Sequence, residues 1–254
     1  MNFHFHNILG GSKRTSLLKK NIAASILIKG ISILSSLLLV PLTLDYVNKE
    51  LYGIWLTLSS IVVWINFFDI GLTLGLKNRL AEALTTHDYI RGKGLVSTTY
   101  FMMLAIFIPV SIIVILLIPF IDWPKLLNVP TIYEKDIQIV LYLLVIFMTI
   151  QMFFNVLNTV VSAYQKTAMA SLFAMLGQLL SLLLIFILTR TTPPSLIGLA
   201  LAISLSPIIV LLIFSRILYT SSFKEISPSY KYIDLKQVKD LFNLGIKFFI
   251  IQYI

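Results

Sequence analysis

The chain has 254 residues, of which 58% are hydrophobic and only 12% charged, and its formal net charge is +9. Ordinary soluble domains have about 25% charged residues, so this composition, with a mean hydropathy of +0.93, excludes a typical water-soluble fold. No cysteine is present, so neither disulfides nor thiolate chemistry can be argued from the sequence.

Six continuous apolar runs are each long enough to cross a bilayer, because a helix rises ~1.5 Å per residue and the hydrocarbon core is ~30 Å thick. In chain order they are residues 21–44, 51–76, 95–121, 137–162, 168–189 and 196–219. The runs are continuous and rich in Leu and Ile, which favours helices over the alternating segments of a β-barrel. The predicted fold is an all-α integral membrane protein, with a six-helix transmembrane bundle at 21–220 after a cytoplasmic N-terminal segment, 1–20.

The end of the sequence predicts a second membrane unit. Residues 221–240 contain Ser, Pro and mixed charges and are interpreted as a cytoplasmic linker that includes a short amphipathic helix on the membrane surface. The apolar stretch 241–254 is about two-thirds of the spanning length and predicts the start of a truncated seventh helix. We therefore expect 21–220 to be the N-terminal lobe of a longer, two-lobe protein.

Lys and Arg residues predict the orientation of the spans. Most of the 20 lie in the N-terminal segment and in the links that follow the second, fourth and sixth spans. The links on the other side hold only Lys49, Lys125, Lys135 and Arg190. The N-terminus is therefore predicted to be cytoplasmic, and basic loops beside the cytoplasmic leaflet need no nucleic acid as a partner.

Two ionisable residues inside the spans are the first candidate functional residues, because charge at bilayer depth is unfavourable and marks function. Lys29 lies eight residues after Asn21, where the first span begins, and Asp69 lies eight residues before Lys77, which follows the second span. Both are therefore ~12 Å from the same surface. Their matched depth permits an ion pair that opens and closes with a cavity. The alternative is that Lys29 extends to the interface while Asp69 bonds nearby hydroxyls or a helix end.

Polar residues follow helical spacing in several spans, which predicts faces turned away from lipid. These stripes are Asn21, Ser25, Lys29, Ser32 and Ser36; Ser59, Asn66, Asp69, Thr73 and Lys77; Gln151, Asn155, Asn158, Ser162 and Lys166; and Ser171, Gln178 and Ser181. The hydroxyls are equally typical of close helix packing. The four amides Asn66, Gln151, Asn155 and Asn158 favour a hydrated central cavity for a polar, anionic solute.

Motifs for other chemistry are missing from the sequence. Its three histidines, His4, His6 and His87, lie outside the spans and lack metal-ligand spacing. There is no phosphate-binding loop and no nucleophile elbow. No metal site, cofactor or enzymatic activity is therefore expected.

Local motifs resemble those of a transporter family. The segments 52–55 (YGIW), 69–72 (DIGL) and 77–79 (KNR) resemble the Wzx-type O-antigen and polysaccharide flippases. The same pattern includes Pro41, the segment 127–130 (LNVP) and the start of a new apolar run near Gly245. The resemblance covers essentially the whole chain.

The resemblance implies a member of the multidrug/oligosaccharidyl-lipid/polysaccharide superfamily, with two six-helix lobes facing one another. Such proteins move a polyprenyl-diphosphate-linked oligosaccharide across the bacterial cytoplasmic membrane by alternating access. Lys29 would contact the anionic headgroup, Asp69 would form a gating pair with Lys29, and the four amides would bind sugar hydroxyls. The expected partners are the lipid-linked oligosaccharide, membrane lipid, a proton or sodium ion for coupling, and the polysaccharide polymerase and export machinery.

Two other functions stay open at this point. A cation-coupled multidrug exporter of the same superfamily is expected to have acidic side chains in its cavity. Asp69 is the only acidic candidate in the predicted stripes. A membrane glycan polymerase or ligase would carry catalytic residues on a large external loop, and no comparably long external loop occurs before residue 254.

Overall fold

The computed structural model describes residues 13–65 and 71–243, and this part is helical with no strand. Its α-helices are α1 (Lys13–Ile65), α2 (Leu72–Thr85), α3 (Tyr89–Leu117), α4 (Trp123–Leu127), α5 (Glu134–Ala163), α6 (Thr167–Thr191) and α7 (Leu196–Thr220). Short 3-10 turns are η2 (Ile118–Phe120), η3 (Thr131–Tyr133), η4 (Lys224–Ile226) and η5 (Tyr230–Tyr232). The all-α prediction is confirmed.

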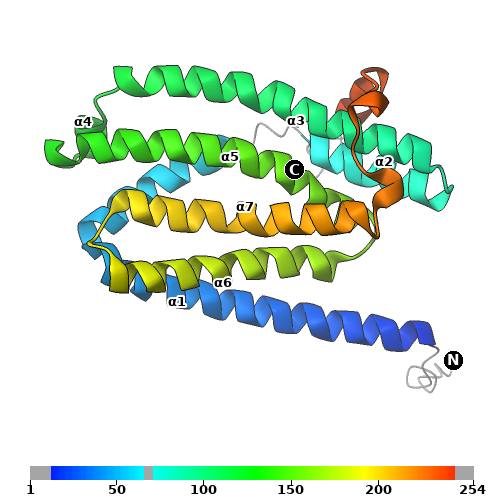
Figure 1. Cartoon of the computed structure of the whole chain (residues 1–254), viewed down its shortest axis with the longest axis horizontal. Coiled ribbons are helices and arrows are strands. Elements are labelled where there is room, and N and C mark those ends of the chain that lie inside the picture. The colour runs from blue at the N-terminus through cyan, green and yellow to red at the C-terminus, as the bar shows by residue number, and fades with distance from the viewer. Residues whose placement is uncertain (1–12, 66–70, 244–254) are drawn as a thin grey trace, which may run out of the picture.

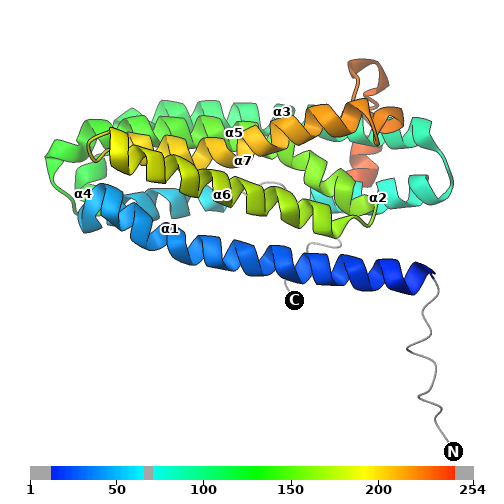
Figure 2. The ribbon, with the colours of Figure 1, turned by 60° about the horizontal axis from the view of Figure 1, so that its bottom comes forward.

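The long helices form one bundle (Figures 1 and 2). α5 packs against both α3 and α7, α7 packs against α6, and α6 packs against α1. The short α2 packs against α3 and α5. Long helices that follow one another from α3 to α7 run in opposite directions, so the packed pairs α5–α7 and α1–α6 each run in the same direction (Figure 1).

Five helical segments among the described residues are long and apolar enough to cross a membrane. They are Ser25–Ser60, Tyr89–Phe120, Thr131–Ala163, Thr167–Thr191 and Leu196–Thr220. The last four correspond to the predicted third to sixth spans. The protein is therefore a multi-pass membrane protein.

The first of these segments is two helical arms joined at Asn48. This residue has φ 70° and ψ 171°, outside the helical region, and its Oδ1 accepts a hydrogen bond from the Leu51 backbone N–H at 3.0 Å. The amide thus caps a new helix start. We call residues 13–47 the first arm and 49–65 the second arm of α1. The predicted first span lies in the first arm, and the predicted second span begins in the second arm.

The predicted second span, 51–76, is not one uninterrupted helix. Residues 66–70 lie outside the described part of the chain, and Gly71 has φ 74° immediately before α2 begins at Leu72. A left-handed φ is easy for glycine because it has no Cβ. Sequence hydropathy did not reveal this break because the residues on both sides of Gly71 are apolar.

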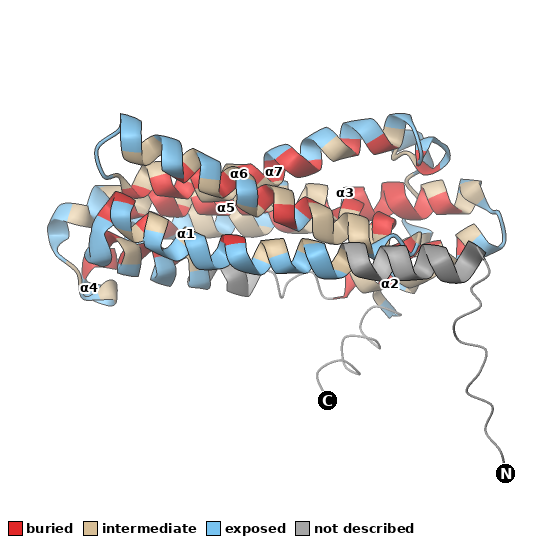
Figure 3. Ribbon diagram, turned by 90° about the horizontal axis from the view of Figure 1, so that it is seen from below, coloured by how far each residue is buried: buried red, intermediate tan, exposed pale blue. Residues whose placement is uncertain are grey.

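Buried residues concentrate where the long helices face one another (Figure 3). The first arm is different, because it contacts α6 along one side and exposes large apolar side chains elsewhere. Leu27, Ile33 and Leu37 are all more than 60% exposed. Exposed apolar surface of this kind suits lipid rather than water.

Tyr46, near the end of the first arm, joins α1 to the link between α6 and α7. Its side chain is buried, and its hydroxyl lies 3.1 Å from Thr192 Oγ1. It also donates to the Pro193 carbonyl at 3.4 Å. The hydroxyl therefore holds two sequence-distant elements together at the end of the bundle opposite the N-terminus.

Replacing Tyr46 with phenylalanine is expected to lower the free energy of unfolding by about 1 kcal/mol, the usual net contribution of a hydrogen bond. The melting temperature of the detergent-purified full-length protein measures this loss. The control is Tyr230→Phe, because Tyr230 is 79% exposed and its hydroxyl takes part in no hydrogen bond within the described residues. Equal melting temperatures for both variants would contradict a stabilising role for Tyr46.

Residues 226–243 pack back onto α2 and α3. The Asp234 backbone N–H donates to Thr98 Oγ1 at 2.9 Å, and the Ser229 N–H donates to Ser97 Oγ at 3.0 Å. Lys93 Nζ lies 4.6 Å from the centre of the Tyr232 ring. Residues of the predicted linker, 221–240, are therefore held against the N-terminal half of α3. A helix at 236–243 begins inside this linker and continues three residues beyond it.

Arg79 fixes the end of this linker to α2. Its guanidinium pairs with Glu82 at 2.9 Å and with Asp240. Arg91 lies 3.5 Å from the other oxygen of Glu82. The hydrogen bond from Arg79, and then the charge of Arg91, hold the pKa of Glu82 below its ordinary value, so this carboxylate stays ionised well into mildly acidic solution.

Candidate functional site

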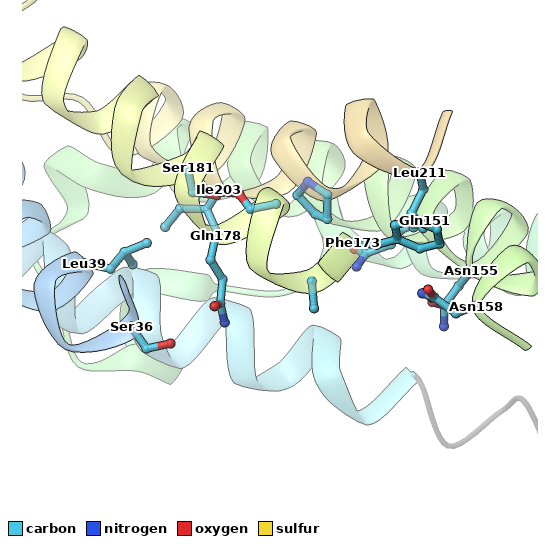
Figure 4. Close-up of a pocket in the computed structure, with 13 residues that line it drawn as sticks. Ser36, Leu39, Gln151, Asn155, Asn158, Phe173, Gln178, Ser181, Ile203 and Leu211 are labelled. Carbon is cyan, nitrogen blue, oxygen red and sulfur yellow. Dashed lines mark hydrogen bonds between the residues drawn. The ribbon is translucent and has the colours of Figure 1, made fainter. Parts of the chain in front are cut away.

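A cavity of about 450 Å³ lies between α1, α5, α6 and α7. Figure 4 shows polar side chains from three of these helices around it. Its lining residues are Ser36, Leu39, Gln151, Asn155, Asn158, Phe173, Ala174, Gly177, Gln178, Ser181, Ile203, Pro207 and Leu211. The cavity therefore has room for a solute of the size of a sugar unit. Its lining contains both polar and apolar side chains.

The amides of α5 lie together on one side of the cavity. Gln151, Asn155 and Asn158 are all half-buried, and their spacing of four and three residues places them on one helix face. Asn158 Nδ2 donates to Asn155 Oδ1 at 2.5 Å. The sequence-predicted stripe thus reaches one cavity, where it presents amide groups.

Two amide oxygens in the lining have no hydrogen-bond partner within the described part of the chain. They are Asn158 Oδ1 and Gln178 Oε1, and both atoms are buried. A buried carbonyl without a donor is unfavourable. Each of these oxygens can still accept a hydrogen bond from a hydroxyl group that reaches it.

The hydroxyls in the lining are already used within their own helices. Ser36 donates to the Ser32 carbonyl at 3.0 Å, and Ser181 donates to the Gly177 carbonyl at 3.1 Å. This pattern is typical of serines in apolar helices. The free hydrogen-bonding capacity of the cavity therefore resides mainly in its amides.

The apolar part of the lining was not predicted. Phe173 of α6 and Leu211 of α7 are buried there, beside Pro207. Their positions in otherwise apolar runs gave no signal, because every face of those helices carries Leu, Ile or Phe. A cavity lined by both amides and an aromatic ring suits a solute with both hydroxyls and an apolar ring face.

The other predicted site residues lie elsewhere or are not described. Lys29 is exposed on the first arm and does not line the cavity. It lies seven residues before Ser36 on the same helix face, a rise of ~10 Å. Asn66 and Asp69 fall outside the described residues. The Lys29–Asp69 gating pair therefore stays a prediction.

The described lining of the cavity carries no ionisable side chain. General acid–base catalysis needs a titratable group within reach of the substrate, and these residues offer none. Among the described residues there is also no cluster of three or more His, Cys, Asp or Glu side chains able to hold a metal ion. What the described lining can do chemically is bind through hydrogen bonds and apolar contact.

The fold and the cavity together define a multi-pass α-helical membrane protein with a hydrogen-bonding cavity inside its bundle. A family model described as polysaccharide biosynthesis protein matches residues 18–254. The chain belongs to this family, which includes the Wzx-type polysaccharide flippases, so the resemblance seen in the sequence is confirmed. No curated protein and no solved structure matches the chain.

Proposed function

We propose that the chain is the N-terminal lobe of a flippase that moves a polyprenyl-diphosphate-linked oligosaccharide across the bacterial cytoplasmic membrane by alternating access. Membership of the polysaccharide biosynthesis family supports a substrate of this class. The observation that carries the proposal is the cavity whose buried amide oxygens at Asn158 and Gln178 lack donors in the described chain. Sugar hydroxyls are donors of the required kind.

The proposed roles follow the chemistry of the substrate. Gln151, Asn155, Asn158 and Gln178 bind sugar hydroxyls, and Phe173 contacts a sugar ring. The polyprenyl chain stays in the bilayer, beside the exposed apolar faces of the first arm. Lys29 binds the diphosphate as it enters from the cytoplasmic side, and Asp69 holds Lys29 when the cavity closes.

Lys29→Ala is expected to reduce glycan export by at least about tenfold, because a charged hydrogen bond to phosphate is lost. Lys29→Arg keeps the charge and is expected to retain most export. The measurement is surface glycan in cells that lack their own flippase and carry the full-length gene. Normal export by Lys29→Ala would overturn the headgroup role.

Lys49→Ala is the matched control, because Lys49 is also exposed on α1 but lies beyond the bend at Asn48. A drug-accumulation assay on the same cells separates the flippase from a cation-coupled drug exporter. Drug efflux without any glycan export would overturn the proposed function.

A further inference from the structure

A second hollow, of about 370 Å³, lies between α3, α5 and α7 near the C-terminal end of α7. Figure 1 shows the C-terminal end of α7 beside the start of the linker. We call it the aromatic crevice, and its lining residues are Tyr100, Phe153, Phe154, Leu212, Ser215, Arg216, Tyr219, Thr220, Ser227 and Pro228. At 100° per residue, its α5 residues are turned about 120° from the amide stripe, so the crevice and the cavity are separate sites.

Arg216 supplies a positive charge at the edge of the crevice. Its side chain is exposed and has no carboxylate partner among the described residues, whose ion pairs involve only Arg79 and Arg91. It lies four residues before the end of the spanning segment Leu196–Thr220, a rise of ~6 Å. That depth is the level of lipid headgroups, where arginine binds phosphate.

Two tyrosine hydroxyls lie at the inner end of the same crevice. The hydroxyls of Tyr100 and Tyr219 are 3.1 Å apart, and both side chains are largely buried. One hydroxyl hydrogen is used in the mutual bond, so the other can be donated to an acceptor oxygen. Arg216 lies three residues before Tyr219 on α7 and lines the same crevice as the tyrosine pair.

The rest of the lining has an apolar part, formed by Phe153, Phe154, Leu212 and Pro228, and three hydroxyl side chains, those of Ser215, Thr220 and Ser227. The rings of Tyr100 and Phe153 meet edge to face with their centres 4.7 Å apart, and the next ring, Phe154, lies 5.3 Å from Phe153. Leu212 is 49% exposed beside them. An alkyl chain can lie along this surface while its headgroup reaches Arg216.

We propose that the aromatic crevice binds one anionic phospholipid, with its phosphate at Arg216 and the tyrosine hydroxyls and an acyl chain along Phe153 and Leu212. Arg216 has no carboxylate partner within the described residues, so its charge favours a lipid of net negative charge over a zwitterionic one, whose headgroup cation repels the guanidinium. The inference does not depend on the transported substrate, because α5 separates the crevice from the amide-lined cavity.

Native mass spectrometry of the full-length protein tests the proposal, with phosphatidylglycerol titrated into the detergent solution. Arg216→Gln is expected to weaken binding of the first phosphatidylglycerol by about fivefold. The control Arg190→Gln is expected to bind like the wild type, because Arg190 is an exposed arginine near the end of α6 and outside the crevice. Phosphatidylcholine with the same chains is expected to bind more weakly and to be insensitive to Arg216→Gln.

A second pair of variants tests the apolar part without changing charge. Leu212→Trp fills the crevice and is expected to lower phosphatidylglycerol binding several-fold, whereas Ile213→Trp adds the same ring at the next, 47% exposed position and is expected to leave it unchanged. Equal binding by Arg216→Gln and wild type overturns the proposal. Displacement by millimolar inorganic phosphate, or by undecaprenyl phosphate at lower concentrations than phosphatidylglycerol, would also overturn it, by assigning the crevice to a free anion or to the transported lipid.

Discussion

Gln178→Leu is expected to lower glycan export by about tenfold or more while leaving the melting temperature unchanged or slightly higher. Gln178 lines the cavity, and its buried Oε1 atom accepts no hydrogen bond within the described chain. Removing a buried, unpaired acceptor relieves an unfavourable group in the folded protein. If a sugar hydroxyl donates to this oxygen during transport, the same change removes a substrate interaction worth about a factor of ten.

A fall in glycan export without a fall in melting temperature distinguishes a substrate-binding residue from a structural one. Gln138→Leu is the control, because Gln138 is a half-buried glutamine of α5 outside the cavity. Cells with this variant are expected to export as much glycan as cells with the wild type. Both variants are measured by surface glycan in flippase-deficient cells and by thermal unfolding of the purified full-length protein. Normal export by Gln178→Leu would remove Gln178 from the binding site, and a large fall in melting temperature would mean that its amide has a structural partner.

The α5 side of the cavity could be predicted from the sequence because its spacing is local. Gln151, Asn155 and Asn158 share a face through the period of a single helix, and polar residues in an apolar span have few places to lie other than inside a bundle. Hydropathy placed the third to sixth spans for the same reason, since each needs only the length of one apolar run.

The rest of the cavity and the aromatic crevice depend on which helices become neighbours, and one sequence does not contain that information. Phe173 and Leu211 lie among many other apolar residues of two different helices, so no periodicity marks them. The Tyr100–Tyr219 pair joins residues 119 positions apart. Asn48 and Gly71 break helices through backbone angles that hydropathy does not report.

The docking of the linker on α2 leads to a second large effect, at Gly75. A Cβ at this position would lie 2.2 Å from the carbonyl oxygen of Leu241 and 2.9 Å from its carbonyl carbon. Real side chains do not approach a backbone this closely, so α2 and residues 236–243 must separate in Gly75→Ala. Leu241 is fully buried at this contact, and the Arg79–Asp240 pair lies one turn further along α2.

Gly75→Ala is therefore expected to destabilise the protein by about 1–3 kcal/mol, the usual effect of overpacking, which lowers the melting temperature by roughly 5 °C. Trypsin is expected to cleave faster after Lys231, Lys236 and Lys239, because the linker is released from α2. Gly53→Ala is the matched control: nothing lies within 4 Å of its added Cβ, and alanine favours a helix interior over glycine by about 1 kcal/mol. Unchanged melting and cleavage in Gly75→Ala would mean that α2 and Leu241 are not in contact in the folded protein.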